Sequence, residues 1–204
     1  MTKDFWTSFK HKELLQLVLF VIGVVAGVML INTFIFQSFT VSGRSMETTL
    51  LNGNRLIVNR IPVTIASVEN KQYTPARGQI IVFKNPNYLD GAGDEYIVKR
   101  VIAFGGERVV LKNGHYTVYN AQNPKGFNPD TTDKNQPGSP TVGDVDVIVP
   151  SGTLFVSGDH RQLDTASNEP YSLDSRNGLG YVPLYDVVGP VSLRIFPFTA
   201  ISTF

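Results

Sequence analysis

An uninterrupted apolar segment near the amino terminus limits what this chain can fold into. Residues 14–36 contain only three polar side chains, Gln16, Asn32 and Thr33, and residues 17–31 contain none. At about 1.5 Å per residue, a helix of this length reaches roughly 35 Å, enough to cross the hydrocarbon core of a bilayer. A helix buried in a soluble core would normally keep a polar face. The segment therefore predicts a transmembrane anchor over 14–36.

A cleaved signal peptide is the alternative interpretation of this segment. Its apolar region would be shorter and would end in a small-x-small cleavage site. Here the large side chains of Phe34, Ile35 and Phe36 end the run instead. We therefore expect an anchor that is retained.

Positive charge is distributed unequally around the anchor. Lys3, Lys10 and Lys12 precede it, whereas Arg44 alone lies among residues 37–54. Lysine and arginine beside a membrane span favour the cytoplasmic side. We therefore expect a single-pass protein of the cell membrane, with residues 1–13 in the cytoplasm and 37–204 forming an extracytoplasmic domain. Small residues spaced four apart, as at 23 and 27, are common in such helices, so the oligomeric state stays open.

Beyond residue 40 the helical period is absent, and short segments rich in Val, Ile, Phe and Tyr replace it. Asn113-Gly114 between two of them predicts a tight hairpin. The segments expected to form strands are 55–59, 80–84, 96–103, 108–111, 115–119, 145–149, 153–157 and 187–195. Because no helical segment separates them, we expect a mainly β domain, an antiparallel β-sandwich or partly closed barrel. Polar insertions are expected near 120–143 and 162–171.

Composition excludes several classes of function. The formal net charge of +1 gives no support to a nucleic-acid partner. The absence of cysteine excludes disulfides, thiolate metal sites and cysteine catalysis. His11, His115 and His160 lie far apart in the sequence and have no ligand spacing, so we expect neither a metal nor another cofactor.

Ser45, shortly after the anchor, is a candidate nucleophile, but a serine hydroxyl needs a base to take its proton. His160 is one candidate base. Its neighbour Asp159 would point to the opposite face of a strand and would orient it poorly. A carboxylate is a second candidate, without a motif to support it.

Lys99 is the third candidate base. In a strand over 96–103 it shares a face with Ile97, Val101 and Ala103. Burial among apolar groups disfavours the charged amine and lowers its pKa. On the local pattern alone, a neutral catalytic Lys99 and a solvated Lys99 at a sheet edge are equally supported.

Four ordered segments resemble those of the bacterial type I signal peptidases, also called leader peptidases. They are Ser45-Met46-x-x-Thr49-Leu50, Lys99-Arg100-Val101-Ile102, Gly158-Asp159-x-Arg161 and Ser172–Gly180. The residues 77–83 resemble the strand between nucleophile and base in that family, and the single anchor is similar to the Gram-positive members. The resemblance implies the fold of that family and a reaction. Signal peptides would be removed from exported preproteins at the outer membrane face by a serine–lysine dyad.

The resemblance also implies residue roles. Ser45 would be the nucleophile, its backbone N–H would hold the oxyanion, and Lys99 would be the general base. Ser172 matches the serine that orients the lysine, although the insertion 162–171 leaves Ser167 and Ser175 as alternatives.

Two ion-pair motifs have supporting roles by the same resemblance. Asp174 and Arg176 match a structural ion pair near the site, which Asp159 and Arg161 would support. His160 stands where the family usually has asparagine. We interpret it as an ordinary polar residue near the site.

Other functions remain as alternatives. A specialised relative could process pilin-like or other selected surface proteins, and a catalytically idle relative could bind export substrates as an assembly factor. Retention of both Ser45 and Lys99 argues against the idle relative. Self-cleaving serine–lysine repressors use the same pair of residues, but they are soluble.

Overall fold

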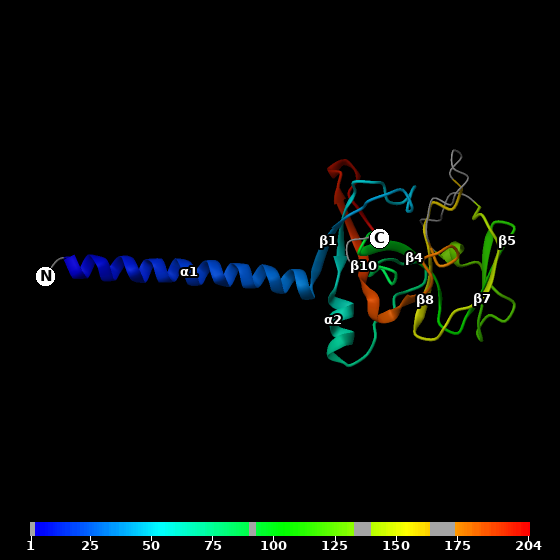
Figure 1. Ribbon diagram of the computed structural model, residues 1–204, viewed down its shortest axis with the longest axis horizontal. Coiled ribbons are helices and arrows are strands. Elements are labelled where there is room, and N and C mark those ends of the chain that lie inside the picture. Colours follow the sequence, from blue (N-terminus) through cyan, green and yellow to red (C-terminus); the bar gives the residue numbers. More distant parts are fainter. Residues whose placement is uncertain (1–2, 90–92, 133–139, 164–173) are drawn as a thin grey trace.

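The computed structural model describes residues 3–89, 93–132, 140–163 and 174–204, with side chains from residue 12 onward. Helix α1 (Lys3–Phe34) projects away from a β-rich body (Figure 1). Its large apolar side chains from Leu14 to Phe34 are 45–68% exposed. Among the described residues, α1 is the helix long and apolar enough to cross a membrane, over Lys12–Phe34. The expected amino-terminal apolar helix is confirmed, although it ends before Phe36, which starts the first strand.

The β-rich body contains two antiparallel sheets. The larger has eight strands in the order β1-β2-β10-β3-β4-β8-β9, with β11 paired to β10. The smaller has three, in the order β6-β5-β7. The strands are β1 (Phe36–Thr40), β2 (Arg55–Asn59), β3 (Ile80–Lys84), β4 (Tyr96–Phe104), β5 (Arg108–Lys112), β6 (His115–Tyr119), β7 (Val145–Ile148), β8 (Thr153–Ser157), β9 (Val182–Pro183), β10 (Val187–Phe196) and β11 (Ser202–Thr203). The predicted mainly β, antiparallel class is confirmed.

Strand β10 joins the two halves of the large sheet. Its first part, Val187–Pro190, pairs with β3, and its later part pairs with β2 and β11. At the junction Gly189 lies so close to β2 that an added Cβ would be 2.4 Å from the Asn59 carbonyl oxygen. The sheet curls here and remains open, with β1 and β9 as its outer strands. The small sheet, β5 to β7, lies at the far end of the body from α1 (Figure 1).

The predicted hairpin is present between β5 and β6. Lys112 pairs with His115, so the turn has two residues. Asn113 and Gly114 have positive φ values of 52° and 84°, which a type I′ turn requires at both positions. The predicted strand segments all form strands, with ends that differ by at most one residue.

The expectation that no helix interrupts the strands was wrong. Helix α2 (Ile61–Val68) follows β2 directly and lies beside the carboxyl end of α1 (Figure 1). Its β-branched residues have weak helix propensity, so the sequence did not indicate a helix. One local and one tertiary hydrogen bond hold it instead. Asn59 Oδ1 accepts a hydrogen bond from the Ile61 N–H at 2.9 Å, and the Thr64 hydroxyl donates to the Phe34 carbonyl at 2.8 Å.

The polar insertions are partly described. The first contains the 3₁₀ turn η1 (Pro129–Thr132), and 133–139 lie outside the described residues. Most of the second, from 164 onward, also lies outside them. Two further 3₁₀ turns, η2 (Leu184–Asp186) and η3 (Phe198–Ala200), flank β10.

Candidate active site

Ser45 lies in the turn region that follows β1. The Glu47 N–H donates to the Arg44 carbonyl at 3.1 Å, and the Leu50 N–H donates to the Met46 carbonyl at 2.8 Å. Met46 and Leu50 are buried in a core cluster with Leu56, Val58 and other apolar residues of β2, β3 and β10. The apolar side chains on this turn therefore fix the backbone that carries Ser45.

Lys99 lies in the middle of β4, between β3 and β8. It pairs with Ile81 of β3, and the residue as a whole is only 3% exposed. Its Nζ lies 2.6 Å from the Ser45 Oγ, within hydrogen-bond distance. The fold thus brings together two residues that are 54 positions apart in the chain.

Burial shifts the ionisation of Lys99 toward the neutral amine. Burial lowers its pKa to about 8, and the carboxylates of Asp174, Asp159 and Asp94 oppose this effect. A lysine with its ordinary pKa, near 10.4, would be almost entirely protonated at pH 7. At a pKa of about 8, about one tenth of the molecules carry a free lone pair at that pH.

A cleft of about 450 Å³ opens beside these two side chains. The chain segment 39–45, from β1 to the serine, forms one wall, and 94–99, at the start of β4, forms the other. The rings of Phe39 and Tyr96 meet across it, with centroids 5.2 Å apart. Leu56 and Val82 also line the cleft. Its mixed apolar and backbone lining suits an extended peptide with small apolar side chains.

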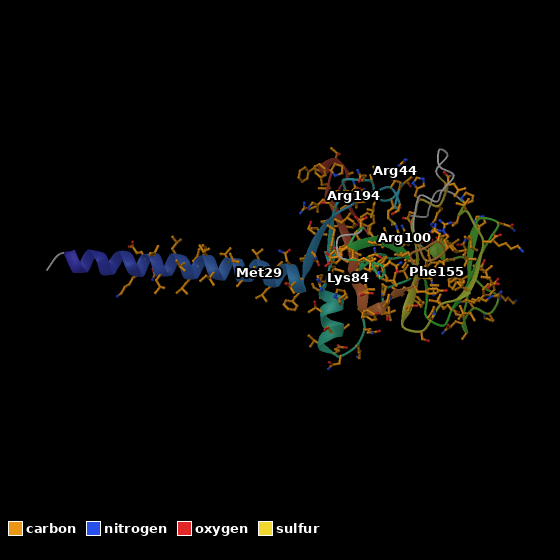
Figure 2. All side chains as sticks on the ribbon, viewed as in Figure 1. Met29, Arg44, Lys84, Arg100, Phe155 and Arg194 are labelled. Carbon is orange, nitrogen blue, oxygen red and sulfur yellow. The ribbon has the colours of Figure 1, made fainter. Side chains whose placement is uncertain are left out.

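A buried ion pair holds the loop after β8 against β4. Arg100 donates to both carboxylate oxygens of Asp159, at 2.8 and 2.7 Å, and the two side chains are 2% and 0% exposed. The Thr49 hydroxyl donates to the same carboxylate at 2.6 Å. Figure 2 shows Arg100 within the β-rich body and Arg44 at its edge. The pair therefore holds together three parts of the site: the turn that carries Ser45, called the serine turn, strand β4, and the loop after β8.

A second polar cluster lies behind Lys99. Asp174 pairs with Arg176 at 3.0 Å and accepts a hydrogen bond from the buried Ser157 hydroxyl at 2.9 Å. The Tyr116 hydroxyl lies 3.3 Å from the Ser157 Oγ, and burial raises the pKa of Tyr116 to about 12. Arg176 also donates to the Val142 carbonyl. This cluster fixes the Asp174 carboxylate near the amine.

Arg161 belongs to a separate set of contacts. It is fully buried. It pairs with Asp130 of η1 at 3.1 Å, contacts the Thr141 hydroxyl at 3.1 Å and donates to the Gly158 carbonyl. Arg161 therefore joins the first polar insertion to the loop after β8.

The structure brings most of the sequence-predicted site residues together. Ser45 and Lys99 line the cleft, and Asp159 and Asp174 lie near enough to the Lys99 amine to affect its pKa. Arg176 pairs with Asp174, whereas Arg161 pairs with Asp130 of η1. Ser172 and Ser167 lie outside the described residues. The Ser175 Oγ accepts a hydrogen bond from the Val156 N–H at 2.9 Å, along β8. In the described part of the chain, no group of three or more His, Cys, Asp or Glu side chains could hold a metal ion.

Sequence reasoning missed the polar partners of the ion pairs. Two of these partners, Arg100 and Thr49, bind the Asp159 carboxylate. Ser157 donates to Asp174, and Asp130 pairs with Arg161. Arg100 follows Lys99 directly on the strand, so the two side chains start on opposite faces. A buried arginine needs a carboxylate partner, and this requirement was the signal that could have linked Arg100 to Asp159.

Known proteins resemble this chain over most of its length. The profile of the family described as signal peptidase, peptidase S26, matches residues 12–196. A protein named signal peptidase I P, from Bacillus subtilis subsp. natto, is 32% identical over 84% of this chain and 82% of its own length. A signal peptidase I from Bacillus licheniformis is 30% identical over 98% of both chains. A solved signal peptidase I from Enterococcus faecalis aligns at 24% identity with a TM-score of 0.41, over 58% of this chain and 97% of that chain.

Proposed function

The chain belongs to the signal peptidase family, peptidase S26, whose members include signal peptidases I, and we propose that it is a membrane-bound serine endopeptidase with a Ser45–Lys99 dyad. Its activity is the removal of signal peptides from exported preproteins. The observation that carries the proposed dyad is the 2.6 Å contact between the Lys99 Nζ and the Ser45 Oγ, made by a lysine that is 3% exposed.

The first half of the proposed reaction forms an acyl-enzyme. The lone pair of neutral Lys99 takes the Ser45 proton while the Oγ attacks the scissile carbonyl carbon. The carbonyl oxygen becomes an oxyanion, which accepts a hydrogen bond from the Ser45 backbone N–H. Protonated Lys99 then gives its proton to the leaving amine as the C–N bond breaks, and the new amino terminus departs.

The second half restores the enzyme. Lys99, again neutral, takes a proton from a water molecule that attacks the ester carbonyl. When the tetrahedral intermediate breaks down, the ammonium returns the proton to the Ser45 Oγ, and the signal peptide leaves with a new carboxylate. Lysine suits both steps because its lowered pKa, about 8, lies close to the operating pH.

The proposed location follows from α1. Its apolar residues from 14 to 34 are exposed and 23 residues, Lys12–Phe34, are long enough for a bilayer. Three lysines precede the segment, which favours a cytoplasmic amino terminus. Residues 37–204, with the cleft, would then form the extracytoplasmic catalytic domain. The Ser45–Lys99 contact argues against an idle relative, because such a protein gains nothing from burying a lysine against a hydroxyl.

One incubation tests the proposal. The full chain, in detergent micelles, is mixed with a preprotein that carries an Ala-x-Ala sequence before its mature part, and the products are weighed by mass spectrometry. We expect one cut after the second alanine, with product masses that sum to the preprotein plus one water. Ser45→Ala is the matched control and is expected to leave the preprotein intact. No cleavage by the wild type, or equal cleavage by the variant, would contradict the proposal.

A further inference from the structure

His160 contacts the backbone next to Ser45 through its ring. Its Nδ1 lies 3.1 Å from the Arg44 carbonyl oxygen and 3.5 Å from the Glu47 Oε2. A carbonyl oxygen can only accept, so the hydrogen bond to Arg44 requires an Nδ1 that carries the proton and donates. The ring is 15% exposed and comes from the loop after β8, far from the serine turn in the sequence.

The backbone of His160 makes a second contact with the same turn. Its N–H donates to the Ser45 carbonyl at 3.0 Å. His160 therefore binds the carbonyl on each side of the Ser45 Cα, one with its ring and one with its main chain. A residue that is merely polar and near the site would not need both contacts.

The Arg44 carbonyl and the Ser45 N–H belong to one peptide unit. Because that unit is planar and trans, the direction of its C=O fixes the direction of its N–H. The Arg44 oxygen accepts two hydrogen bonds, one from His160 and one from the Glu47 N–H at 3.1 Å. These two donors hold the oxygen edge of the plane, and the N–H points the opposite way.

The Ser45 N–H itself is available to a ligand. Within the described residues it donates to no protein acceptor. Ser45 lines the cleft, whereas His160 does not. An unused backbone donor on a residue that lines the cleft meets the requirement of an oxyanion for a nearby N–H.

We propose that His160 is a positioning residue, which aims the Ser45 N–H at the oxyanion by holding the Arg44 carbonyl. The inference rests on the proposed function, since the oxyanion forms only if Ser45 attacks a carbonyl. Among the described residues, His160 contacts the carbonyls of Arg44 and Ser45, so it acts through the peptide plane. Its loss should therefore slow the chemical step without weakening the binding of the peptide in the cleft.

Substitutions at His160 separate this role from general structural support. In His160→Ala the ring donor is lost, while the backbone N–H to Ser45 remains. We expect kcat to fall about 10- to 100-fold with KM within twofold, since loss of an entire oxyanion donor costs about 10²–10³ in kcat. In His160→Asn the amide nitrogen occupies a place close to that of the Nδ1 and can donate to the same carbonyl. We expect this variant to recover at least a third of the wild-type kcat.

A spectroscopic readout keeps the inference independent of activity. The full chain is labelled with ¹⁵N-serine in micelles, and the Ser45 amide is assigned by its disappearance in Ser45→Ala. We expect the order parameter of this amide to fall in His160→Ala and to be restored in His160→Asn. His115→Ala, at an exposed histidine on β6, is the control and should change neither the amide nor kcat.

The outcomes distinguish the inference from the proposed function. If His160→Ala keeps kcat within twofold and leaves the Ser45 amide rigid, His160 has no positioning role, while cleavage by the wild type still supports the dyad. Equal losses in His160→Ala and His160→Asn, or a loss confined to KM, would also overturn the inference. If the wild type cleaves no preprotein, the proposed function fails, and the amide measurement alone decides whether His160 holds the peptide plane.

Discussion

The Lys99 Nζ lies 2.6 Å from the Ser45 Oγ, and the lysine is buried in the middle of β4. Asp159 and Asp174, which pair with Arg100 and Arg176, lie close enough to the amine to oppose the lowering of its pKa. The proposed dyad therefore pairs a hydroxyl with an amine whose charged form is disfavoured by burial.

Replacement of the amine by an apolar group of similar length should separate activity from stability. Lys99→Met removes the base, and we expect kcat/KM to fall roughly 10²–10⁴-fold. Because burial disfavours the lysine ammonium, the Tm of this variant should equal or exceed that of the wild type. Peptide cleavage and thermal unfolding of the same preparation give both values.

Lys99→Arg completes this test, because a guanidinium stays protonated and cannot accept the serine proton. We expect no cleavage from it, whereas Lys71→Arg, at an exposed lysine, should be as active as the wild type. Cleavage by Lys99→Arg at more than a few per cent of the wild-type rate would exclude Lys99 as the base.

The Arg100–Asp159 pair should contribute strongly to the stability of the catalytic domain. Asp159→Asn leaves a 2% exposed guanidinium without its carboxylate, and the loss of one partner of a buried pair costs about 3–5 kcal/mol. The expected fall in Tm is roughly 10 °C for a domain of this size. Asp146→Asn breaks a pair that is half exposed on both sides, and it should leave the Tm unchanged. Similar Tm values for both variants would mean that the buried pair stabilises the domain no more than the exposed pair does.

The close approach of β10 to β2 should make Gly189 sensitive to any side chain. In Gly189→Ala the new Cβ would lie 2.4 Å from the Asn59 carbonyl oxygen and 3.1 Å from the Val58 Cγ1. The strands must separate, and we expect a loss of about 1–3 kcal/mol, measured by denaturant unfolding. Gly27→Ala, where no heavy atom lies within 4 Å of the added Cβ, is the control. An unchanged unfolding midpoint for Gly189→Ala would mean that this junction is looser than the structure indicates.

The proposed orientation can be tested by labelling because the chain has no cysteine. We expect a cysteine introduced by Lys71→Cys, on the exposed segment after α2, to react with a membrane-impermeant maleimide in intact cells. A cysteine from Ser8→Cys, before the apolar segment, should react only after the membrane is permeabilised. The reverse pattern would place the cleft on the cytoplasmic side.

The sequence predicted the parts of the fold that depend on local pattern. The strands and the Asn113-Gly114 turn follow from alternation and from the conformational freedom that a two-residue hairpin demands. Helix α2 could not be predicted in this way, because its residues favour extended structure, whereas contacts with β10 and a hydrogen bond to Phe34 hold it as a helix. The end of α1 at Phe34 and the start of β1 at Phe36 could not be predicted either, because the apolar run continues through both residues.

The candidate site was predictable only in part, for a related reason. The spacing of Ser45 and Lys99 resembles a family pattern, but period-two reasoning left the lysine equally consistent with a solvated edge. In the structure β4 is an inner strand, paired with β3 and β8, so Lys99 does not stand at a sheet edge and is buried. The pairing of Arg100 with Asp159, and the two contacts of His160, depend on where the loop after β8 crosses the serine turn. Such a crossing leaves no periodic signal in the sequence.

The pH dependence of kcat/KM tests the central claim most directly, because it reports the ionisation of the free enzyme's base. The measurement uses the full chain in micelles and a short fluorogenic Ala-x-Ala peptide without ionisable side chains, between pH 5.5 and 9.5. We expect the rate to rise tenfold per pH unit at low pH and to level off above an apparent pKa of about 8, where the Lys99 amine becomes neutral. A rate that is already maximal at pH 6 would contradict the claim that this lysine takes the serine proton.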